Sequence, residues 1–199
     1  LAEINDELGA ARTNKKEFLE KLEAIIPWET FLELIQPRYY KGELGNKPYP
    51  LELMLRIFIL QNVYNLADMA VMNEVIDSRA FSNFCGINSP SEVPDGDTIG
   101  RFRNILTRNG LQEKIFAAVV KILMERKLIL KKSGQYAAKK KEHQKSSVRC
   151  KVEHVFAVIK NIFRHRKTRH RGLRKQTAKL NIMFALANLY LAARKSLTV

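Results

Sequence analysis

Residues 51–64 read LELMLRIFILQNVY, and this stretch decides the fold. Apolar side chains occupy nearly every face of the helix that the pattern predicts, so we expect that helix to be central and buried almost all round. Pro50 suits the start of the helix, because the N–H that proline lacks has no partner in the first turn. A short break follows at Asn65.

More helices are expected on both sides of this one. Residues 15–35 predict one or two amphipathic helices around Pro27, and Asp97 is the expected N-cap of a later helix. The apolar spacing predicts further helices over residues 66–76, 78–84, 98–108 and 111–129. No stretch alternates convincingly with period two, so residues 1–130 are expected to form one all-α domain.

The rest of the chain is also expected to be helical, which makes the fold class mainly α. Residues 131–148 are polar and cationic, as in a solvated linker. Residues 149–199 begin with a helix up to about residue 163, continue through a basic loop to Gly172, and end with a helix over about 177–195. That last helix is apolar on most faces, so it needs a partner to bury it.

Charge is divided very unevenly along the 199 residues, whose net charge is +15. Residues 1–97 hold 9 Lys and Arg against 16 Asp and Glu, whereas residues 98–199 hold 26 against 4. Such a basic half is typical of proteins that bind a polyanion. Nucleic acid is the leading candidate and an anionic membrane surface is the second. Residues 1–16 carry no signal-peptide pattern and Cys85 and Cys150 have no metal-site spacing, so we expect a cytoplasmic protein with reduced thiols.

The strongest candidate for DNA binding is a basic run between residues 164 and 175. Its seven bases are Arg164, Arg166, Lys167, Arg169, Arg171, Arg174 and Lys175, and it contains no acid. Lysine and arginine neutralise phosphates and release counterions, so we expect this run to contact the DNA backbone. An ordinary solvated loop is the alternative. His165 and His170 are five apart and have no apparent partner ligands, so no metal site is expected there.

A second DNA-binding candidate is the helix expected over residues 98–108, which carries Arg101, Arg103 and Arg108. A recognition helix uses such side chains for base edges and phosphates. The helices over 66–76 and 78–84 are alternatives, and a purely structural helix with solvated arginines is equally open.

One acid stands alone among bases in the segment RCKVEHVFAVIK, residues 149–160. Arg149, Glu153 and Lys160 are four and then seven residues apart, which places them on one helix face. A carboxylate in such a setting suits phosphodiester chemistry, but one carboxylate alone is too few for that chemistry. An ion pair between Arg149 and Glu153 is the alternative.

Four segments resemble DDE transposases of bacterial insertion sequences, of the insertion-sequence-five type. They are IIPWETFLELIQPRYYKGELGNKPYPLELMLRIFILQNVYNLADMAV, VPDGDTIGRFRNIL, KVEHVFAVIKNIF and KTRHRGLRKQTAKLNIMFALANLYLAARK. They occur in the family order and cover roughly residues 20–130 and 148–195. The resemblance implies a helical N-terminal domain, followed by C-terminal helices left over from a ribonuclease-H-like catalytic domain.

The family's signature is Tyr, two residues, Arg, three residues, Glu, six residues, Lys. Arg149, Glu153 and Lys160 fall at these spacings, but Ser146 stands at the tyrosine position. The resemblance makes Glu153 the third acid of the DDE triad. The family's two catalytic aspartates lie on a sheet for which there is no room between Leu130 and Lys151, and no aspartate follows Asp97. The resemblance therefore implies an internally deleted transposase.

The family reaction uses two Mg²⁺ or Mn²⁺ ions held by three carboxylates. Glu153 alone is too few, so we expect no metal bound by this chain alone and no strand transfer by it. The expected function is that of a nucleoid-associated transposase-like protein that binds double-stranded DNA at transposon ends, as a homo-oligomer or with a full-length transposase. The alternatives are an active transposase or nuclease whose metal site, including Glu153, is completed in trans, and a basic membrane-surface protein.

Overall fold

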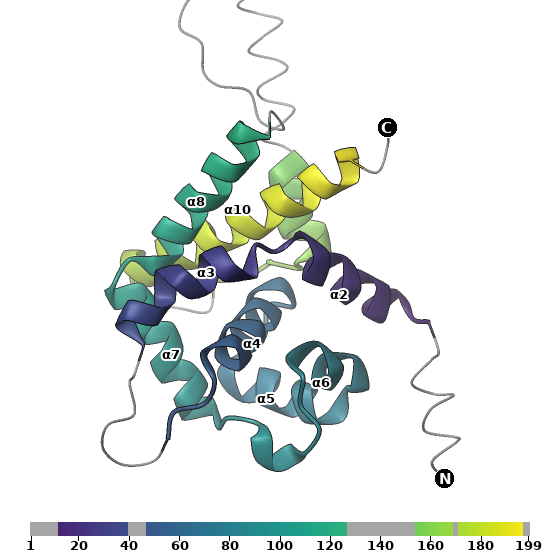
Figure 1. The fold of residues 1–199 in the computed structure, drawn as a ribbon, viewed down its shortest axis with the longest axis vertical. Helices are drawn as coiled ribbons and strands as arrows, with labels where there is room; N and C mark the ends of the chain where they lie inside the picture. The colour runs from purple at the N-terminus through teal and green to yellow at the C-terminus, as the bar shows by residue number, and fades with distance from the viewer. Residues whose placement is uncertain (1–11, 40–46, 127–153, 169–170, 197–199) are drawn as a thin grey trace, which may run out of the picture. The chain divides into compact units, whose positions relative to one another are not determined.

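The computed structural model describes residues 12–39, 47–126, 154–168 and 171–196, and no strand is assigned within these ranges. The predicted class, mainly α, is therefore confirmed (Figure 1). Contacts between residues divide the chain into two compact units. The first unit comprises residues 1–61 and 66–105, and the second comprises residues 62–65 and 106–199.

The elements follow the expected order. The α-helices are α2 (Asn14–Ile25), α3 (Trp28–Ile35), α4 (Leu51–Val63), α5 (Asp68–Asp77), α6 (Arg79–Cys85), α7 (Gly96–Arg108), α8 (Leu111–Glu125) and α10 (Leu173–Ser196). The shorter elements are the 3₁₀ helices η1 (Gln36–Arg38) and η2 (Pro90–Glu92) and the π-helix η3 (Val158–Ile162).

Helix α4 is central to the core of the first unit, as its sequence predicts. Its apolar side chains are buried on several faces, with Leu55, Ile59 and Leu60 fully covered. Trp28 and Tyr39 pack as half-buried aromatics at the edge of this core. The Tyr39 ring meets Phe102 edge-on with 5.8 Å between ring centroids, and the Tyr39 hydroxyl donates to the Tyr49 carbonyl over 2.7 Å.

The N-cap of α7 differs from the prediction. Helix α7 begins at Gly96, and Asp95 rather than Asp97 caps it. The Asp95 carboxylate accepts a hydrogen bond from the Thr98 backbone N–H at 2.7 Å and another from the Thr98 hydroxyl at 3.0 Å. The pKa of Asp95 is lowered chiefly by the bond from the Thr98 backbone. Either aspartate has the chemistry of an N-cap. Asp95 is the cap because α7 begins at the next residue, which places its carboxylate at the free N–H of Thr98.

In the second unit, α8 and α10 pack side by side (Figure 1). The Phe184 ring contacts Phe116 of α8 at 6.4 Å and Phe156 at 5.3 Å between ring centroids. Leu186 and Leu189 of α10 are buried, so α10 gains the burial that its sequence requires. Helix α10 begins at Leu173, four residues earlier than predicted, so Arg174 and Lys175 lie in its first turn.

The contacts group α8 with α10, whereas the sequence places residues 111–129 in the N-terminal domain. The predicted linker over residues 131–148 lies outside the described residues, so the predicted domain boundaries stay predictions. Cys85 is buried with a free thiol, as expected, and Cys150 lies outside the described residues.

Candidate nucleic-acid interface

The positive charge is concentrated in the second unit. Where side chains are described, this unit carries thirteen Lys and Arg against two Asp and Glu, whereas the first unit carries ten against twelve. The bases between residues 160 and 175 are all exposed wherever they are described. We call them the basic segment: Lys160, Arg164, Arg166, Lys167, Arg171, Arg174 and Lys175. Arg169, the remaining base of the predicted run, lies outside the described residues.

A π-helix starts the basic segment and a left-handed residue turns the chain after it. The Phe163 backbone N–H closes η3 by donating to the Val158 carbonyl over 3.0 Å, and the Phe163 side chain is fully buried. Arg164 follows with φ +51°, a conformation that costs an arginine about 1–2 kcal/mol. Phe163 is buried and the chain turns at Arg164, and three cationic side chains line one shallow depression here. Its lining residues are Lys160, Asn161, Arg164, His165 and Arg166.

Asn65 holds this turn in place. It too has φ +51° and lies just after α4, where the Leu66 N–H reaches back to the Gln61 carbonyl over 2.9 Å. Its Nδ2 donates to the Arg164 carbonyl over 3.4 Å, and its Oδ1 accepts from Lys179 Nζ at 2.7 Å. The sequence does not predict this role of Asn65 and of Lys179. An asparagine directly after a strong helix indicates a left-handed cap, but its distant partners leave no signal in the sequence.

His165 is the uncharged member of this cluster. Burial lowers the pKa of its imidazole, and the charge of Lys179 lowers it further. Its Nδ1 atom is buried and makes no hydrogen bond to any described group. His165 is therefore neutral near pH 7, and the positive charge of the depression comes from its lysine and arginines.

Two predicted DNA-binding residues meet at the other end of the basic segment. Arg174 Nη2 donates to the Arg108 carbonyl over 2.9 Å. This contact joins the end of α7 to the first turn of α10 within the second unit. The bond places the Arg174 guanidinium at the backbone of Arg108, 66 positions earlier in the sequence, and both side chains are exposed.

The other two arginines of the predicted recognition helix lie in the first unit, and they differ in exposure and in their contacts. Arg101 is exposed on α7. Arg103 forms an ion pair with Asp68 of α5, and Gln61 donates to the same carboxylate. Arg103 therefore holds α5 against α7 in the absence of DNA, and its predicted contact with DNA stays a prediction.

Two of the three residues of the predicted catalytic signature, Arg149 and Glu153, lie outside the described residues. Lys160 is described and is exposed at the depression. Within the described ranges, no three His, Cys, Asp or Glu side chains are grouped so that they could hold a metal ion. None of the helices searched there is long and apolar enough to cross a bilayer.

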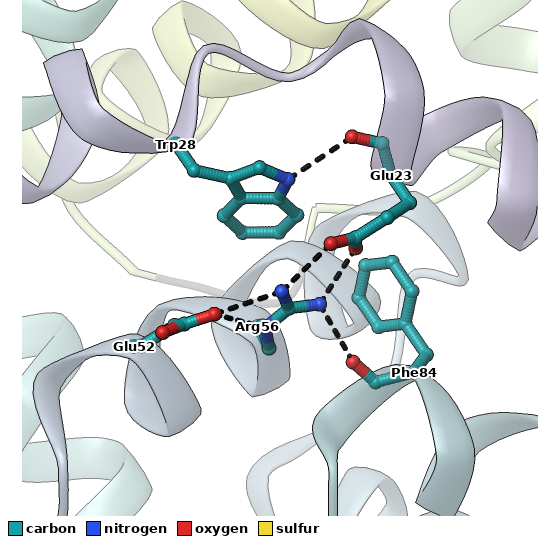
Figure 2. A network of polar contacts seen from close by, with 5 residues as sticks. All are labelled: Glu23, Trp28, Glu52, Arg56 and Phe84. Atoms are coloured by element: carbon teal, nitrogen blue, oxygen red, sulfur yellow. Dashed lines mark hydrogen bonds and ion pairs between the residues drawn. The ribbon is translucent and has the colours of Figure 1, made fainter.

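A dense polar network in the first unit is structural. Arg56 of α4 makes five hydrogen bonds, which use all the N–H groups of its guanidinium (Figure 2). Both Glu23 oxygens accept, at 2.6 and 2.7 Å, and the Phe84 carbonyl accepts at 2.8 Å. The guanidinium also lies 4.4 Å from the Trp28 ring centroid. No donor is left over for a ligand, so the network joins α2, α4 and α6.

Comparison with known families gives two matches. A model described as "Transposase domain (DUF772)" matches residues 6–105, and one described as "Transposase DDE domain" matches residues 90–189. No solved structure matches the chain. Each family match spans half of the 199 residues, and together they reach from the first helices into α10. The chain therefore belongs to the DDE transposase family.

Proposed function

We propose that this transposase binds double-stranded DNA at the ends of an insertion sequence of the insertion-sequence-five type, and that alone it does not catalyse strand transfer. The observation that carries the proposal is the concentration of exposed bases in the second unit, where only two described acids offset thirteen bases. The proposal places the protein in the cytoplasm on the nucleoid, as a homo-oligomer or with a full-length transposase.

The basic segment has the chemistry of a backbone contact. Arginine and lysine bind phosphate oxygens and release condensed counterions, which supplies affinity without reading sequence. Three of its cations surround one depression, and two hydrogen-bonded anchors, Asn65 to Arg164 and Arg174 to Arg108, fix its course. Preference for transposon ends requires contacts to base edges. We assign these contacts to α7, where Arg101 is exposed.

The lack of catalysis rests on the sequence. Two-metal phosphodiester chemistry needs several carboxylate oxygens around the ions. Of the family triad only Glu153 has a counterpart here, because no aspartate follows Asp97 and only twenty residues separate Leu130 from Lys151. The residues present do not fit a complete two-metal site. A chain that binds ends without cutting them would compete or co-assemble with a full-length transposase.

Fluorescence anisotropy of the purified chain tests the DNA-binding part. The probes are duplexes from the two edges of its genomic locus and a scrambled duplex, at about 50 and about 200 mM salt. We expect tighter binding to the edges, with affinity falling steeply as salt rises. Equal affinity for the edge and scrambled duplexes would remove end recognition and leave a nonspecific DNA-binding protein.

A nicking assay tests the catalytic part. With Mg²⁺ or Mn²⁺ and edge duplexes, we expect no cleavage by the chain alone. Cleavage by the wild-type chain that disappears in Glu153→Gln would contradict the proposal. Cleavage that needs both this chain and a full-length transposase, and that Glu153→Gln abolishes, would instead support completion of the metal site in trans.

A further inference from the structure

We propose that Asn65 is a positioning residue for DNA binding: through the Arg164 carbonyl it fixes the turn that presents Arg164 to a DNA phosphate. This inference rests on the proposed function, because it concerns how the basic segment grips DNA. Asn65 carries no charge and is 9% exposed, so it is not itself a phosphate contact.

The backbones of Asn65 and Arg164 share an unusual conformation. Within the described residues, Asn65 and Arg164 are the two non-glycine residues with positive φ, and they are hydrogen bonded to each other. Left-handed conformations away from glycine persist where surrounding contacts hold them, and they gather at functional sites. Asparagine tolerates this conformation because its side chain bonds locally, whereas arginine does not. The strain therefore lies mainly at Arg164, and the amide of Asn65 helps to hold it.

Both ends of the Asn65 side-chain amide make hydrogen bonds. Its amide donates to the Arg164 carbonyl and its oxygen accepts from Lys179, 114 positions further along the chain. The Asn65 amide is buried, and its two partners are 99 and 114 positions away in the sequence. It therefore links segments that are far apart along the chain. Lys179 lies on α10, so the turn is fixed to the helix that carries Arg174 and Lys175.

The turn at Arg164 determines where the Arg164 side chain lies relative to Lys160 and Arg166. Phe163 anchors the residue before the turn in the core, and the backbone of Arg164 then reverses, which leaves the Arg164 side chain exposed beside Lys160 and Arg166. If the turn relaxed to an ordinary conformation, the Arg164 side chain would leave this group. Three cations around one depression contact a phosphate together only while the turn holds.

The test is a double-mutant cycle on DNA binding, with the full chain and a random duplex as the probe. Asn65→Gly keeps the left-handed backbone without strain and removes both side-chain bonds. We expect it to weaken binding about five- to tenfold and to lower the salt slope by about 1, as Arg164→Gln does. In an Arg164→Gln background, Asn65→Gly should change the Kd by less than about twofold, because the side chain that it positions is already gone.

Two further variants make the result decisive. Asn65→Asp keeps the shape, the left-handed tolerance and the acceptor for Lys179, but it loses the donor to Arg164 and adds a negative charge. Because the added charge acts in both backgrounds, the variant should weaken binding more in the wild type than in Arg164→Gln, even if Asn65→Gly does not fold. Asn88→Gly, at an exposed loop position of the first unit, is the matched control and should bind like the wild type.

The possible failures are distinguishable. If the wild-type chain does not bind the duplex, the proposed function fails and the inference with it. If the wild type binds and both Asn65 variants keep its Kd and salt slope, only the inference fails. An equal loss in the wild-type and Arg164→Gln backgrounds would also overturn it, since Asn65 would then act through general structure.

Discussion

Asn65 and Arg164 are 99 positions apart, share φ +51°, and are joined by a hydrogen bond from Asn65 Nδ2 to the Arg164 carbonyl at 3.4 Å. Each lies two residues after the end of a helix, Asn65 after Val63 of α4 and Arg164 after Ile162 of the π-helix η3. The arginine at this turn is in a strained conformation that glycine would adopt without strain. This difference between arginine and glycine gives the first prediction.

Arg164→Gly should stabilise the protein and weaken DNA binding at the same time. Glycine removes the left-handed penalty but gains entropy in the unfolded chain, which leaves a net increase of about 0.5–1 kcal/mol in the free energy of unfolding. The lost cation should lower the salt slope of DNA binding by about 1. Arg166→Gly is the control, because Arg166 does not have a positive φ. Urea unfolding that shows both variants equally destabilised would contradict the strain argument.

Arg56→Met should destabilise the first unit by about 2–3 kcal/mol, because it leaves Glu23 and the Phe84 carbonyl without their donor. Arg56→Lys keeps the charge but cannot make the paired bonds to Glu23, so it should lower the free energy of unfolding by about half as much. Urea denaturation measures both, with Arg101→Lys at an exposed position as the control. A loss below about 0.5 kcal/mol for Arg56→Met would show that this network contributes little.

The sequence predicts the helices well and the contacts between them poorly. Residues 51–63 are apolar on nearly all faces, which requires a central helix, and Pro50 marks a helix start that the structure confirms at Leu51. The one or two helices expected around Pro27 are two, α2 and α3. The sequence places the cap of α7 wrongly at Asp97, because Asp95 and Asp97 have the same chemistry. It places the start of α10 four residues late, because the first turn of that helix is polar.

The candidate interface shows the same limit. Its bases are visible as a run in the sequence, because charge density is a local property. Asn65 and Lys179 are not visible, since their roles come from hydrogen bonds across 99 and 114 positions. The ion pair that occupies Arg103 depends on where α5 packs, and sequence spacing does not report that.

The thiol of Cys85 should be inert in the folded protein. Burial raises its pKa to about 12, although the charge of Arg56 acts in the opposite direction. The reactive thiolate is therefore scarce at pH 8, and its reaction with a thiol reagent should be at least about a hundredfold slower than in urea. The measurement uses Cys150→Ser, so that Cys85 is the remaining cysteine. Equal rates in buffer and in urea would mean that Cys85 is accessible.

His165 should make stability depend on pH. Its folded pKa is lowered by burial and by Lys179, so below the unfolded value of about 6.5 the unfolded state binds more protons. The contribution is present above that value and is lost as pH falls through the folded pKa. The melting temperature of the wild type should therefore fall more between about pH 7.5 and about 5.5 than that of His165→Gln. Parallel falls would assign the effect to other groups.

The central claim is that the basic segment binds the DNA backbone, and the salt dependence of DNA affinity tests it most directly. The logarithm of the association constant should fall against the logarithm of salt with a slope of about −4 to −6. Replacing Arg164, Arg166 and Lys167 by Gln should lower that slope by about 3, whereas replacing Lys21, Arg38 and Lys47, three exposed bases of the first unit, should leave it unchanged. An unchanged slope in the first triple variant, or no binding by the wild type at about 50 mM salt, would contradict the account.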